Sequence, residues 1–303
     1  RTARRHGVVR GRAAFIQTAT ASMSARAASA ITALAGHRAV LIPAASDFTP
    51  LVLIGGTGQW VDSWTTHVSG FRDRPLLLYE TAGQGKVAHD LSDMTLTRHT
   101  RDLQAVLAAA GWADRPVDLA GFSFGGRLAM AAAASGGLQV RRVVSTAVAS
   151  RRTARGRFAL RGCLASLRSG DMQGFGYQIT LASYSSSFLA EHEARVPKWV
   201  DALARECTSE GVGAIIAETL ATEEEEHPLH TERLASRIAS AGAVEGGLII
   251  SGTEDAFSTL SSGADLARVA GWEHLPIEGA AHAVPLEKPR AWRDAVKGFL
   301  AKP

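Results

Sequence analysis

The stretch DLAGFSFGGRLAMAAAA, from Asp118 to Ala134, decides the fold. A short apolar run leads into Ser123, and an alanine-rich run typical of a helix follows. A serine adds nothing to a hydrophobic core, so its position needs another explanation. GFSFG fits the pattern G-x-S-x-G, in which the serine occupies a sharp strand-to-helix turn and its hydroxyl stands clear of the sheet. Gly121 and Gly125 suit this turn, because larger side chains would collide where the backbone bends back.

A pentapeptide of this kind also arises by chance, and Ser123 could simply cap a helix, since serine is favoured there. Its context favours a catalytic interpretation. Asp255 in GTEDAF and His282 in GAAHAVP follow in the order Ser, Asp, His. Each comes directly after an expected strand, and the carboxyl ends of parallel strands meet at one edge of a sheet. We therefore expect the three side chains to lie together.

These residue types suit nucleophilic catalysis. A serine hydroxyl is a weak nucleophile until an imidazole takes its proton, and a carboxylate holds that imidazole in the correct tautomer. Glu254 is an alternative acid, but the spacing from Gly252 favours Asp255, and His274 is expected to be structural. Five further histidines show no metal-ligand spacing and are expected at the surface: His89, His99, His192, His227 and His230. We expect no metal site.

Short apolar runs alternate with helix-like segments along most of the chain. The strand candidates are residues 51–56, 75–80, 116–121, 140–148, 247–252 and 273–279. This alternation predicts an α/β fold, with a mostly parallel central sheet flanked by helices. Between about residues 151 and 240 helix-like stretches follow one another without a convincing strand, which predicts a helical cap. The expected parts are a core (47–150 and 241–303), a cap (151–240) and an N-terminal extension (1–46).

With these motifs in place, the sequence resembles the α/β-hydrolase superfamily, in its branch of serine hydrolases with a helical cap. LVLIGGTGQWVDSW resembles the family's first oxyanion segment, GFSFGG its nucleophile elbow, and LIISGTEDAF with LPIEGAAHAVPLEKP its acid and histidine loops. The resemblance implies that Ser123 is the nucleophile and His282 the general base. It implies that Asp255 orients the imidazole.

The resemblance also implies an oxyanion hole formed by the backbone amides of Thr57 and Phe124. One such donor typically lowers the barrier by ~3 kcal/mol. The family's usual His-Gly is replaced here by two glycines, the second of which is Gly56, so the support of this loop must differ. Gly56 and Trp60, beside the hole, are expected to contact the substrate.

Three functions remain open from the sequence. Most chains with this apparatus hydrolyse a carboxylic ester, lactone or thioester through an acyl-Ser123 intermediate. The elbow SFGGR is also similar to the branch that eliminates pyruvate in menaquinone and phylloquinone biosynthesis, where arginines hold an anionic substrate. In that case Arg127 contacts the substrate and residues 151–161 supply further cations; otherwise Arg127 simply faces solvent. A ligand receptor or scaffold with the same fold is the third alternative.

The composition excludes other classes. The net charge of +4 comes from the first 46 residues, which contain seven arginines and no acid, so the remainder has 26 basic and 29 acidic residues. A nucleic-acid-binding domain would carry its own basic surface, so no nucleic-acid partner is expected. No apolar stretch approaches the ~18 residues of a membrane span, so stable membrane insertion is not expected. Cys163 and Cys207 support neither a disulfide framework nor a zinc site. No cofactor is implied.

The acid-free, arginine-rich leader has the composition of an organellar transit peptide for a chloroplast or a mitochondrion. A floppy extension and a cytoplasmic protein are the alternative. The expected partner is a small ester, thioester or anionic substrate, and the oligomeric state is not predicted.

Overall fold

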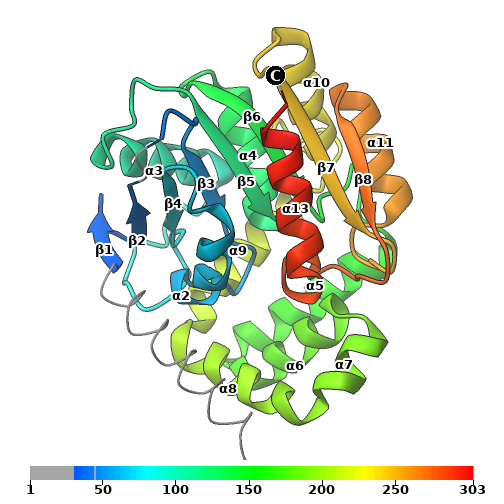
Figure 1. Ribbon diagram of the computed structural model, residues 1–303. Helices are drawn as coiled ribbons and strands as arrows, with labels where there is room; N and C mark the ends of the chain where they lie inside the picture. The colour runs from blue at the N-terminus through cyan, green and yellow to red at the C-terminus, as the bar shows by residue number, and fades with distance from the viewer. Residues whose placement is uncertain (1–30, 44–45, 303) are drawn as a thin grey trace, which may run out of the picture.

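The computed structural model describes residues 31–43 and 46–302, and its centre is an eight-stranded sheet (Figure 1). The strands are β1 (Ile31–Leu34), β2 (His37–Ile42), β3 (Leu51–Ile54), β4 (Leu76–Tyr79), β5 (Val117–Phe122), β6 (Val140–Thr146), β7 (Gly246–Gly252) and β8 (Glu273–Ile277). Their order is β1-β2-β4-β3-β5-β6-β7-β8. The strands β3 to β8 are parallel, whereas β2 pairs antiparallel with β1 and β4. The predicted α/β fold with a mostly parallel sheet is confirmed.

Helices cover both faces of this sheet. Side chains of β3 alternate between two hydrophobic clusters, with Val52 and Ile54 in one and Leu51 and Leu53 in the other. The first cluster is closed by α3 (Leu96–Ala109), α4 (Phe124–Ser135), α10 (Thr231–Ala241) and α11 (Leu260–Ala270). The second is closed by α2 (Val61–Trp64), η1 (Thr65–Phe71), α12 (Val284–Glu287) and α13 (Pro289–Leu300). Strands buried on both faces read as unbroken apolar runs, as LVLI does here.

The N-terminal boundary of the core differs from the prediction. Residues 31–42, expected in an extension, form β1 and β2 of the central sheet. Val40 is buried opposite Leu78 of β4, and the Arg38 guanidinium lies 3.3 Å from the Glu80 carboxylate. Composition was misleading at this point because Arg38, counted as part of a basic leader, contacts an acid of the folded core. Residues 1–30, which hold most of the transit-peptide signal, lie outside the described residues.

A separate group of helices lies at one end of the sheet, where Figure 1 shows α6, α7 and α8 together. This group, called the cap below after the predicted element, consists of α5 (Ala154–Arg168), α6 (Met172–Ser183), α7 (Ser186–His192), η2 (Glu193–Arg195), α8 (Val196–Glu206) and α9 (Ser209–Ala221). It has its own hydrophobic cluster, which includes Phe175 and Ile216. Cys163 and Cys207 are free and buried in this cluster, and burial raises the pKa of each thiol to about 11.

The cap ends earlier than expected. Helix α10 was placed in the cap, but Leu234, Ala235 and Ile238 of this helix belong to the sheet's first hydrophobic cluster, against α4 and α11. The sequence pattern gives the apolar face of an amphipathic helix but not the surface against which that face packs. The cap therefore runs from α5 to α9.

Candidate active site

Ser123 occupies the sharp turn between β5 and α4 that the G-x-S-x-G pattern predicts. Its backbone has φ 51° and ψ −114°, a conformation that costs a residue with a Cβ on the order of 1–3 kcal/mol. A Cβ on Gly121 would lie 2.1 Å from the carbonyl oxygen of Gly125, and one on Gly125 would lie 2.3 Å from that of Ile54. Both positions therefore require glycine because backbone passes close by.

The structure brings the three predicted polar side chains into one hydrogen-bonded series. His282 Nε2 lies 3.0 Å from Ser123 Oγ, and His282 Nδ1 lies 2.9 Å from Asp255 Oδ2. Since an ionised carboxylate only accepts, Nδ1 donates to it and a neutral ring keeps Nε2 free to accept from the serine hydroxyl. Glu254, the alternative acid, is exposed. The arrangement can take a proton from Ser123 and so activate it.

The carboxylate and the imidazole are both fixed by their surroundings. Asp255 Oδ1 accepts hydrogen bonds from the amides of Phe257 and Ser258, at 2.7 and 2.8 Å. The His282 ring lies between the rings of Phe122 and Phe257, with centroids 5.5 and 5.1 Å away. Only 6% of His282 is exposed, so water competes little for its hydrogen bonds.

The two amides of the predicted oxyanion hole lie at this site. Phe124 is the first residue of α4, so its N–H has no partner within the helix and stands at the helix's positive end. Thr57 follows β3 and lines the cavity around Ser123. Both residues therefore line the cavity that contains Ser123, the position that the predicted oxyanion donors require.

Gln59 explains how the oxyanion loop is held without the family's histidine. The side-chain oxygen Oε1 of Gln59 accepts hydrogen bonds from the backbone amide of Gly56 at 2.7 Å and from Trp64 Nε1 at 2.6 Å. The backbone amide of Gln59 donates to Gln84 Oε1 at 2.9 Å. Gly56 itself packs under Phe122, where a Cβ would lie 2.7 Å from the ring. Gly56 lines neither of the two cavities described below, and its contact with substrate stays a prediction. Sequence reasoning missed Gln59.

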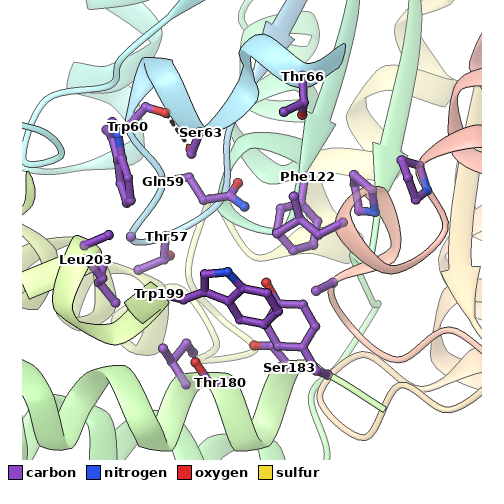
Figure 2. A pocket seen from close by; sticks show the side chains of 18 of the residues that line it. Thr57, Gln59, Trp60, Ser63, Thr66, Phe122, Thr180, Ser183, Trp199 and Leu203 are labelled. Carbon is purple, nitrogen blue, oxygen red and sulfur yellow. Dashed lines mark hydrogen bonds between the residues drawn. The ribbon is translucent and has the colours of Figure 1, made fainter. Parts of the chain in front are cut away.

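A large cavity lies between the cap and the carboxyl edge of the sheet (Figure 2). Its volume is about 590 Å³, and its wall includes the predicted substrate-binding residue Trp60. In Figure 2, Trp60 and Leu203 lie on the side of the cavity opposite Phe122. Aromatic rings of the cap form another part of the wall: the centroids of Tyr184 and Phe188 are 5.1 Å apart, and the Trp199 ring lies 6.1 Å from that of Phe188.

A second, small cavity of about 50 Å³ contains Ser123 and His282 in its wall. Its apolar wall includes Leu160, Ile216 and Phe257 from the cap cluster, in addition to Phe122, Phe124 and Ile179. Its cation, Arg152, was not singled out from the sequence, although it lies in the basic segment considered there. Arg152 is paired with Glu223 at 3.1 Å, so its charge is already neutralised.

Arg127 takes neither of the two positions expected from the sequence, which were contact with the substrate and exposure to solvent. It is 3% exposed, and its guanidinium donates to the Thr219 carbonyl and the Thr222 hydroxyl of α9. Burial and the nearby Arg152 charge lower its pKa to about 10. It lines neither the large nor the small cavity. Its hydrogen bonds connect α4 to the end of α9. The first turn of a helix can be recognised from sequence, but the element that covers it cannot.

Glu287 connects the His282 loop to the cap, a role that no sequence pattern indicated. One carboxylate oxygen accepts from the Ala281 amide at 2.9 Å; the other accepts from the Ser185 amide at 3.1 Å and hydroxyl at 2.6 Å. The Ala283 amide donates to the Ser183 carbonyl at 2.8 Å. The residues on both sides of His282 are therefore bonded, directly or through Glu287, to the turn after α6.

Two histidines expected at the surface are instead buried. His99 is fully buried against the ring of Phe124, 5.0 Å away, and burial lowers its pKa to about 4. His230 is 3% exposed. His274 donates to or accepts from Ser251 Oγ at 3.1 Å, in keeping with a structural position. Within the described residues, no group of three or more His, Cys, Asp or Glu side chains could hold a metal ion.

The structure has the features of a known class, the α/β proteins that present a serine on a nucleophile elbow. These features are the order of the sheet, the strained backbone of Ser123 and the hydrogen bond between Ser123 and His282. The sequence profile of the alpha/beta hydrolase family matches residues 51–295. The chain belongs to this family. None of the helices within residues 31–43 and 46–302 has the length and apolar character of a membrane span.

Known proteins resemble the chain in sequence and in fold. A curated relative from Azorhizobium caulinodans, named as a carbamate hydrolase, RutD, is 34% identical over 83 residues, which is 27% of this chain and 31% of that protein. The match thus spans about a third of the relative's length. The enol-lactonase of Burkholderia xenovorans has a TM-score of 0.74 at 19% identity, over 90% of this chain and 100% of its own. A thermophilic esterase of Thermogutta terrifontis has a TM-score of 0.71 at 18% identity, over 89% and 96%. At these identities the solved structures support the fold alone.

Proposed function

We propose that this protein is a serine hydrolase that cleaves a carboxylic ester through an acyl-Ser123 intermediate. The observation that carries the proposal is the pair of hydrogen bonds from Ser123 to His282 and from His282 to Asp255, at 3.0 and 2.9 Å. A third group that orients the base is the arrangement by which weak hydroxyl nucleophiles are activated. Lactones and thioesters would follow the same chemistry.

The steps follow from the geometry. His282 Nε2 takes the proton of Ser123 as its Oγ bonds to the ester carbonyl carbon, and the amides of Thr57 and Phe124 stabilise the oxyanion. The intermediate collapses, the carbon–oxygen bond to the alkoxy group breaks, and His282 returns the proton to the departing alcohol. Water then gives a proton to His282 and attacks the acyl carbon. The bond from that carbon to Ser123 Oγ breaks, His282 returns the proton to Oγ, and the acid is released.

The lining of the cavities favours a neutral, largely apolar ester over a polyanion. The pyruvate-eliminating alternative needs cations that converge on the substrate. Arg127 is bonded to α9, and Arg152 is paired with Glu223. The large cavity has a single cation in its wall, Arg293, and otherwise presents mainly aromatic and aliphatic side chains, a setting suited to acyl groups.

Two measurements test this proposal. A fluorophosphonate probe should label the wild type and not Ser123→Ala, whereas Ser92→Ala, which changes an exposed serine, should label normally. Hydrolysis of methyl heptanoate, followed by acid release in a pH-stat, should fall by about 10³-fold or more in His282→Ala, with the fold retained by circular dichroism. Unchanged hydrolysis in His282→Ala, or release of pyruvate from an anionic cyclohexene substrate without ester cleavage, would overturn the proposal.

A further inference from the structure

Ser123 lines the small cavity, and this cavity adjoins the large one. The large and the small cavity share Thr57, Phe122, Ile179 and Ser183 in their walls. Thr57 is also one of the two candidate oxyanion donors. When Ser123 attacks a carbonyl whose oxygen faces those donors, the shared wall allows the two remaining substituents of the carbon to enter different cavities.

The two cavities differ more than tenfold in size, about 590 against about 50 Å³. A group the size of a water needs roughly 10–15 Å³ by this kind of measure, so the small cavity holds about four non-hydrogen atoms. Its apolar wall is rigid in character, because Ile216 is fully buried and Leu160 and Phe257 are 7% and 3% exposed. All three belong to the cap's own hydrophobic cluster.

The position of His282 decides which half of the ester enters which cavity. The His282 imidazole lines the small cavity, whereas the next residue in the chain, Ala283, lines the large one. The departing alkoxy oxygen has to receive its proton from His282 Nε2, so it must lie on the imidazole's side. The alkoxy group then occupies the small cavity and the acyl chain the large one.

We propose that the substrates are carboxylic esters with a short alkoxy group, of one to three carbons, and a long or bulky apolar acyl group. This inference rests on the proposed function and names its substrate class. An alkoxy group larger than the cavity must displace Leu160 or Ile216 before Ser123 can reach the carbonyl carbon. The acyl chain meets no such limit, and its burial against the aromatic wall of Tyr184, Phe188 and Trp199 contributes favourable transfer energy.

Two isomeric esters separate the orientation from general hydrophobicity. Methyl heptanoate and hexyl acetate have the same atoms and differ only in which side of the carbonyl carries the chain. We expect kcat/KM to be at least about thirtyfold higher for methyl heptanoate, a ratio within the range by which pocket fit discriminates substrates. A ratio near one, or a preference for hexyl acetate, would overturn the inference.

Variants of the small cavity provide the second arm. Leu160→Ala and Ile216→Ala should each narrow the ratio by about tenfold, because the added space admits a longer alkoxy chain. Leu167→Ala, a matched deletion in the same hydrophobic cluster at a residue that lines neither cavity, should leave the ratio within about threefold. Fluorophosphonate labelling verifies that each variant keeps a working site. If both small-cavity variants label normally and the ratio stays at its wild-type value, the assignment of the alkoxy group is wrong.

The two levels of the proposal fail differently. A wild type that labels with the fluorophosphonate but hydrolyses both isomers equally contradicts the substrate class alone. A wild type that neither labels nor hydrolyses either isomer contradicts the proposed function.

Discussion

Replacing Glu287 with glutamine is expected to loosen both the cap and the loop of His282. The carboxylate accepts three hydrogen bonds and is 8% exposed. Glutamine keeps one acceptor oxygen and turns the other into an NH₂ donor, which then faces either the Ala281 amide or the two donors of Ser185. Loss of a charged hydrogen bond costs about 1.5–3 kcal/mol, and an unpaired buried donor adds to this. We expect the free energy of unfolding to fall by about 3 kcal/mol.

The same substitution should reduce turnover beyond any loss of folded protein. Ala281 directly precedes His282, and a misplacement of about 1 Å in a reacting group costs on the order of a hundredfold in rate. We expect kcat for methyl heptanoate to fall tenfold to a hundredfold while KM changes little. Urea denaturation gives the stability, and a fluorophosphonate titration gives the concentration of intact sites for the kcat.

The control is Glu278→Gln, the same chemical change at an exposed position of the same region. It should leave both the denaturation midpoint and kcat unchanged. If Glu287→Gln matched this control in both measurements, the three hydrogen bonds would not position His282. A loss of stability with normal kcat per titrated site would leave Glu287 a structural residue only.

Three further predictions concern the oxyanion loop, the buried histidines and Arg127. Gln59→Leu leaves the Gly56 amide and the Trp64 indole unpaired and should lower kcat by about 10²-fold. Gln59→Glu retains the acceptor, so its kcat should stay within about tenfold of wild type. Steady-state kinetics on methyl heptanoate distinguish the two variants. Burial, together with the nearby Arg293 charge, lowers the pKa of His67 from 6.5 to about 3. Between these two pH values the unfolded chain therefore binds more protons than the folded protein does. The unfolding free energy should therefore drop by about 2 kcal/mol from pH 7.5 to pH 5, and His67→Phe should remove that part of the drop in urea denaturation at the two pH values. Arg127→Met should lower the unfolding free energy by about 2 kcal/mol and leave KM for methyl heptanoate unchanged, since the guanidinium bonds α9; a raised KM with normal stability would contradict this.

The elements around Ser123 could be predicted because their signals are local. Six parallel strands read as short apolar runs, and the glycines on either side of the serine mark a turn that no other residue can make, as the approach of 2.1 Å at Gly121 shows. Asp255 and His282 were found by the same means, because each follows a strand and parallel strands deliver their carboxyl ends to one edge.

The errors concern contacts between distant parts of the chain. Arg127 and Thr219 are 92 residues apart, and the sequence of α4 carries no mark of the helix that covers it. Helix α10 was assigned to the cap for the same reason. The strand β2 was missed because its arginine was counted with the leader, while its pairing partner β4 lies more than thirty residues further along the chain.

In the proposed mechanism, the division between core and cap separates the chemistry from the specificity. Ser123, Asp255 and His282 follow strands of the core, and their geometry depends on the sheet. Leu160 and Ile216, which limit the small cavity, come from cap helices, as do Phe188 and Trp199 in the wall of the large one. Changes in the cap should therefore alter which ester is cleaved without altering how it is cleaved. Glu287 is the exception, because it bonds the cap to the loop that carries the base, and through it the position of the cap can reach the reaction itself.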